Sequence, residues 1–151
     1  MKSIFKNLLL LFVLLVLTTS EISVKENQLI GTWKLVSGKN NGVPAPQVLA
    51  DRLQIFSKDK TFESKVNTPN GLKHGNGGLY FLPNDTTIVT FHKDMNGKLS
   101  KIANTYFFRI KNDSLHLYGN YLAEIKENPS VLQKVFIDEL WVKTDKKKTG
   151  N

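Results

Sequence analysis

Hydrophobic and polar residues alternate with a period of two along nearly the whole chain after residue 30. This spacing is typical of β-strands with one buried face, because successive side chains of a strand point to opposite sides. The alternating segments are also rich in Val, Ile, Thr, Phe and Tyr, which fit a pleated surface. Eight strands are therefore predicted, at residues 31–37, 51–57, 61–67, 78–83, 86–93, 100–110, 114–121 and 134–143.

The connections between several of these strands are short enough for hairpins. Residues 58–60, 83–85 and 112–113 each join two predicted strands, and Asn96-Gly97 is a strong hairpin signal because both residues tolerate positive φ. Short turns force sequential strands to be antiparallel, and closure of the sheet removes its exposed edges. The predicted fold is all-β, an eight-stranded antiparallel up-and-down barrel.

Three segments interrupt the alternation. Residues 38–50 and 67–78 contain many Gly, Asn and Pro residues, so both are expected to be loops. Residues 122–133 are expected to hold one short helical turn opened by Asn128-Pro129-Ser130. Loops of this length are uncommon unless they are functional or disordered, and two of the three could close the mouth of a barrel.

The first twenty residues read as a signal peptide. Lys2 and Lys6 precede the apolar run 8–17, and the small residues 18–20 suggest cleavage after Ser20. The alternative, a membrane anchor, would need roughly 17–25 apolar residues, and the uncharged stretch here spans only residues 7–20. The predicted organisation is a signal peptide at 1–20, a barrel domain at 21–143 with no transmembrane segment, and a basic tail at 144–151.

Composition narrows the class of protein further. The chain has no cysteine, which excludes a lipid-modified cysteine anchor, disulfides and thiol chemistry. Of the formal net charge of +8, Lys2 and Lys6 contribute two units and the tail after Val142 three, so the barrel itself is only weakly basic. An exported protein, periplasmic or extracellular and not a lipoprotein, is therefore expected.

Short motifs in the barrel resemble those of a known family. Gly31-x-Trp33 on the first strand, the Phe56-x5-Phe62 hairpin and the segments 112–117 and 139–143 are similar to the exported lipocalin-like domains of Bacteroidetes. This resemblance implies a barrel with a small molecule bound in its interior.

The residues allow a physical reading that does not need the resemblance. Gly31 would let the chain pass close beneath a large ring, and Trp33 would fill the closed end of the barrel. Trp141 on the last strand is the second structural tryptophan.

Candidate ligand-binding residues follow from the alternation. On strand 100–110, Asn104 and Tyr106 share one face, while Phe107 and Arg109 share the other, and neither face is cleanly polar. Which face points inward is left open. If Trp141 points inward, Glu139 does too. The candidates are thus Arg109 to pair with a ligand carboxylate, and Glu139, Asn104, Tyr106 and Phe107 around it. The alternative places Arg109 outside in water.

Other chemistry has little support in the sequence. No catalytic motif, phosphate loop or cofactor signature can be read, and His74, His92 and His116 show no metal-ligand spacing. Nucleic-acid binding is disfavoured because basic residues are not interleaved with aromatic ones on one strand face.

The first hypothesis for function is non-enzymatic binding of a small apolar or amphipathic molecule. The alternatives are a structural or interaction module whose barrel is filled by its own side chains, and a small enzyme. Oligomeric state is left open.

Overall fold

The computed structural model describes residues 24–45, 51–94, 96–125 and 128–144, without the side chains of 123–130. The predicted signal peptide and residues 145–151 of the predicted basic tail lie outside the described residues. The elements are α2 (Val24–Leu29), β1 (Gly31–Asn40), β2 (Val43–Pro44), β3 (Arg52–Phe56), β4 (Thr61–Thr68), β5 (Gly71–Asn84), β6 (Thr87–Lys93), β7 (Leu99–Lys111), β8 (Ser114–Ile125) and β9 (Asn128–Lys143).

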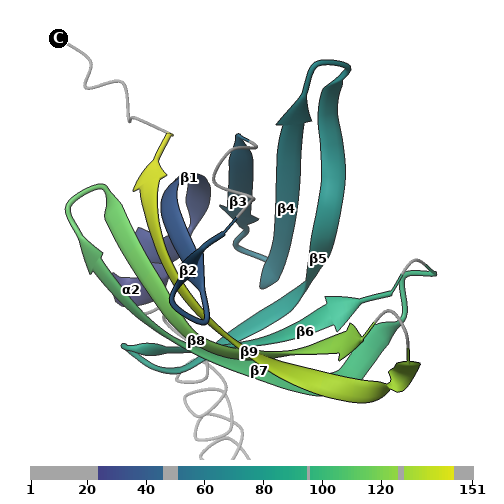
Figure 1. Ribbon diagram of the computed structural model, residues 1–151. Helices are drawn as coiled ribbons and strands as arrows, with labels where there is room; N and C mark the ends of the chain where they lie inside the picture. Colours follow the sequence, from purple (N-terminus) through teal and green to yellow (C-terminus); the bar gives the residue numbers. More distant parts are fainter. Residues whose placement is uncertain (1–23, 46–50, 95, 126–127, 145–151) are drawn as a thin grey trace, which may run out of the picture.

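Eight of the strands form a closed antiparallel barrel, as the alternation predicted. Sequential strands from β3 to β9 pair as neighbours, and β1 closes the ring by pairing with β3 on one side and β9 on the other. The short β2 pairs with the end of β1 and is an extra strand outside the ring. Figure 1 shows β6 to β9 curving as one wall, with β3, β4 and β5 standing as the other.

The glycine-rich segment 67–78 is mostly strand, so the expectation of a loop is wrong. β4 and β5 extend through it as one hairpin, with the pairs Val66↔Lys73 and Thr68↔Gly71. Glycine is a poor strand former, but here close backbone approach requires it. A Cβ on Gly78 would lie 1.9 Å from the backbone oxygen of Phe91 on β6.

The other two interruptions are also more regular than expected. Residues 38–40 continue β1, and Asn41-Gly42, both with positive φ, turn the chain into β2. The remainder of that expected loop, residues 46–50, lies outside the described residues. The helical turn expected at Asn128 is wrong, because β9 begins at that residue and pairs back to β8.

The helix α2 packs against one end of the barrel. Trp33 is fully buried there, and its indole N–H donates to the backbone oxygen of Leu29 at 2.7 Å. Lys60, in the β3–β4 turn, pairs with Glu26, and Lys143 at the end of β9 donates to the backbone oxygen of Gln28 at 2.8 Å. This end is therefore closed. No helix in the described part of the chain is long and apolar enough to span a membrane.

Candidate functional site

The barrel encloses a cavity of about 350 Å³ that is partly open to solvent. Alternation along the strands supplies its lining, since every second side chain points inward. The lining residues come from all eight barrel strands, and half of them are aromatic or aliphatic while the other half are polar or charged. They are Asn40, Arg52, Gln54, Phe56, Phe62, Ser64, Val66, Asn76, Ile88, Thr90, His92, Tyr106, Leu117, Tyr121, Ile137 and Glu139.

The structure resolves which face of β7 points inward. Asn104 and Tyr106 are buried, whereas Phe107 and Arg109 lie on the exposed outer face. The expectation that Phe107 and Arg109 line the interior is therefore wrong. The ring of Phe107 instead stacks on Tyr118 of β8, with centroids 5.7 Å apart. An outward face of this kind keeps the arginine charge in water, where it is well solvated.

Three of the predicted candidates do lie in the interior, but they do different things. Tyr106 and Glu139 line the cavity. Asn104 is buried without lining it, and its side-chain oxygen accepts from the backbone N–H of Leu122 at 2.9 Å. The β7–β8 ladder ends at Thr105↔Asn120, so Asn104 satisfies a backbone donor just beyond the last pair. Its role is structural.

The principal charged pair of the cavity includes a residue that sequence reasoning missed. Arg52 Nη1 donates to Glu139 Oε1 at 3.1 Å, reaching from β3 to β9 on the far side of β1. The guanidinium carbon also lies 5.0 Å from the ring centroid of Trp141, a cation–π distance. A signal was present in the sequence, because Arg52 lies four residues before the aromatic Phe56 and therefore on the same strand face.

Burial shifts the pKa of Glu139 and of its neighbour Tyr106. Glu139 is 2% exposed, and its burial raises the pKa of the carboxyl, with the Arg52 charge acting in the opposite direction. Oε2 of Glu139 and Nε1 of Trp141 are both buried, and neither has a hydrogen-bond partner within normal geometry. The indole N–H of Trp141 nevertheless acts to lower the pKa of Glu139, because it stabilises the charged carboxylate. Burial, together with the Glu139 charge, raises the pKa of the Tyr106 hydroxyl, so Tyr106 is neutral near pH 7.

His92 is the histidine of the cavity wall. Its ring packs edge-on against Phe62 with centroids 5.1 Å apart, and its Nε2 lies 3.5 Å from Thr90 Oγ1. Burial lowers the pKa of His92, which favours the neutral imidazole.

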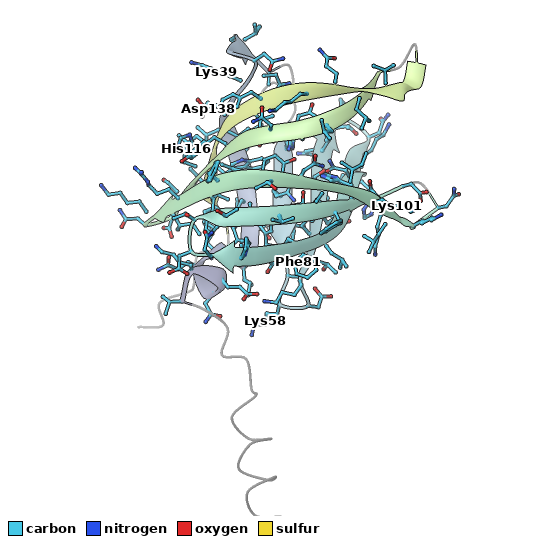
Figure 2. The ribbon with its side chains drawn as sticks, turned by 90° about the horizontal axis from the view of Figure 1, so that it is seen from below. Lys39, Lys58, Phe81, Lys101, His116 and Asp138 are labelled. Atoms are coloured by element: carbon cyan, nitrogen blue, oxygen red, sulfur yellow. The ribbon has the colours of Figure 1, made fainter. Side chains whose placement is uncertain are left out.

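The other two histidines lie away from the cavity lining. His116 Nε2 is 2.7 Å from Asp138 Oδ1, and Figure 2 shows the two side chains close together on the outer surface of the barrel. His74 pairs with Glu63 in the β4–β5 hairpin. Within the described ranges, no three His, Asp or Glu side chains gather as a metal site would require.

The three residues expected to be structural occupy the closed end. Trp33 and Trp141 are both fully buried. Gly31 has φ of 134°, which a residue with a Cβ rarely adopts, and it pairs with Phe56 at the start of the β1–β3 ladder. Trp141 has a second function, since its ring supports the Arg52 guanidinium that faces the cavity.

The site can therefore enclose a small molecule between apolar walls and one fixed ion pair. Comparison with protein-family models and with curated proteins finds no match for this chain.

Proposed function

We propose that the protein is an exported, lipocalin-like carrier that binds one small apolar or amphipathic molecule inside its barrel without chemical change. The observation that carries the proposal is the cavity of about 350 Å³, which lies in the range of roughly 300–1,000 Å³ typical of small-molecule sites. Most of the lining surface is apolar, with polar groups set among it, and this combination is also typical of such sites.

The rival hypothesis is a barrel filled by its own side chains, acting as a structural or interaction module. Eight strands are compatible with either a packed interior or one small ligand. The closed end is indeed packed, around Trp33, Trp141 and Tyr80, which are all fully buried. The remaining volume favours the carrier, because packed protein interiors contain few voids larger than a water molecule.

Export is proposed on the sequence of residues 1–20 alone. The test is the mass of the mature protein recovered from the exported fraction of a bacterial host. A chain that begins after Ser20 supports the proposal, and an uncleaved chain held in the membrane contradicts it.

The carrier proposal is tested by native mass spectrometry of the same protein. A reproducible extra mass that is released on unfolding is the expected result, and it would identify the ligand. A bare mass, also after incubation with a lipid and metabolite extract, would refute the carrier and favour the filled barrel.

A matched pair of variants locates the ligand. Val66 and Asn67 are neighbours on β4, but Val66 lines the cavity whereas Asn67 is exposed. Val66→Trp should fill part of the cavity and abolish the extra mass, and Asn67→Trp should retain it. Equal retention by both variants would place the ligand elsewhere.

A further inference from the structure

The chemistry of the cavity indicates which class of small molecule it takes, and this inference rests on the proposed carrier function. Arg52 is held in one orientation by two contacts, the hydrogen bond from Nη1 to Glu139 and the ring of Trp141 beneath it. Its side chain is 20% exposed, whereas that of Glu139 is 2% exposed. Both side chains line the cavity, and the cation is the more exposed of the two.

Most of the hydrogen-bonding capacity of Arg52 is left for a ligand. A guanidinium has five N–H donors, and the bond to Glu139 uses one of them. A fixed guanidinium suits a planar carboxylate, which can accept two parallel hydrogen bonds. Among the described residues that line the cavity, Arg52 is the one side chain with a permanent positive charge. A single cation matches a ligand with one negative charge better than a phosphate monoester, which carries two.

The apolar part of the lining suits the apolar body of such a ligand. Phe56, Phe62, Ile88, Leu117 and Ile137 supply the apolar walls. If each non-hydrogen atom needs about 30 Å³, as a water molecule does in the liquid, the cavity of about 350 Å³ accommodates roughly twelve such atoms. This size corresponds to a medium-chain carboxylate such as decanoate.

We propose that the cavity binds an amphipathic monocarboxylate whose carboxylate is received by Arg52, in competition with the carboxylate of Glu139. Glu139 is a positioning residue in this scheme. It holds the guanidinium in place, and its own negative charge opposes the incoming anion.

The competition makes anion binding dependent on pH. Because burial raises the pKa of Glu139, falling pH protonates this carboxyl before an ordinary glutamate, and the protonated form no longer neutralises Arg52. As pH rises through this titration, the charged Glu139 returns and anion binding weakens. The other titratable groups that line the cavity with the pair are Tyr106 on β7, Tyr121 on β8 and His92 on β6, and the Glu139 charge acts on Tyr106.

The experiment compares decanoate with 1-decanol by isothermal titration calorimetry between pH 5.5 and 8.5. Both probes have the same chain, so the ratio of their affinities isolates the charge of the head group and cancels other effects of pH on the cavity. In the wild type, decanoate should bind more tightly than 1-decanol, and the ratio of the decanoate affinity to the decanol affinity should fall as pH rises.

Three variants assign the effect to residues. Glu139→Gln should raise the ratio at pH 8.5 by roughly tenfold, the equivalent of one charge-assisted hydrogen bond, and remove its pH dependence. The double variant Arg52→Gln/Glu139→Gln, which leaves no unpaired buried charge, should lower the ratio by roughly tenfold or more from that of Glu139→Gln. Arg109→Gln is the matched control, because this arginine lies on the outer face of β7, and its ratio should equal that of the wild type.

The outcomes separate this inference from the proposed function. If decanol binds as tightly as decanoate, or the double variant keeps the ratio of Glu139→Gln, the assignment to Arg52 is overturned while a carrier remains. If Glu139→Gln leaves the ratio unchanged at every pH, the competition is overturned. Absence of binding by both probes together with a bare native mass refutes the carrier itself. Circular dichroism spectra and melting curves of each variant establish that it is folded.

Discussion

Trp33 offers the sharpest test of how the barrel is held together. Its side chain is fully buried at the closed end, in one apolar cluster with Leu29, Phe56, Leu115 and Trp141. Replacement by alanine removes an entire indole from a site that β1 and α2 hold on two sides, so the space can collapse only in part. Large-to-small changes of this kind cost about 3–5 kcal/mol.

The hydrogen bond of Trp33 adds to this cost. Its indole N–H satisfies the backbone oxygen of Leu29 at 2.7 Å, and a buried acceptor left without a donor costs about 1–3 kcal/mol. Trp33→Phe separates the two effects, because it keeps most of the ring volume and removes the donor. We expect Trp33→Ala to lie at the upper end of the range and Trp33→Phe to cost about 1–3 kcal/mol.

The assay is urea denaturation followed by far-ultraviolet circular dichroism, with the free energy of unfolding extrapolated to water. Val36→Ala is the control on the same strand, since this side chain is 50% exposed and its loss should change stability by less than about 0.5 kcal/mol. A loss for Trp33→Ala below about 1 kcal/mol, or equal losses for Trp33→Ala and Trp33→Phe, would refute the reasoning about this end of the barrel.

Two further predictions concern β5 and β6. Gly78→Ala should cost at least about 1–3 kcal/mol, because the added Cβ would lie 1.9 Å from the Phe91 backbone oxygen and force β5 and β6 apart; a thermal melt like that of the wild type would contradict the close approach. Burial lowers the pKa of His92 in the folded state from its usual 6.5, so the unfolded chain binds the proton more tightly than the folded one. The free energy of unfolding should therefore decrease as pH falls below 6.5. Unfolding curves at pH 5 and pH 7.5 for the wild type and His92→Gln should show a smaller loss in the variant, and equal losses would rule out His92 as the source.

Much of the fold is predictable from the chain because alternation is a local property. The period of two and the short turns predict the eight strands of the barrel, and Asn96-Gly97 predicts the β6–β7 hairpin, in which Gly97 has φ of 79°. The burial of Trp33 and Trp141 also follows from their position among alternating apolar residues.

The site is less predictable, because alternation tells which residues share a face and not which face is inside. On β7 both faces carry aromatic and polar residues, so only packing against the other strands places Tyr106 inward and Arg109 outward. The neighbouring strands likewise determine that residues 71–78 form a strand. A glycine-rich sequence has little strand propensity of its own, and this segment is a strand because its backbone pairs closely with β4 and β6.

The sequence by itself therefore determined the eight strands of the barrel, their antiparallel order and the two structural tryptophans. The tertiary structure alone decided the charged pair of the cavity, because Arg52 and Glu139 are 87 residues apart and meet only when β1 closes the ring between β3 and β9. A contact of this kind depends on the register of β1 against both β3 and β9, and alternation within one strand leaves a shift of two residues against a partner undecided.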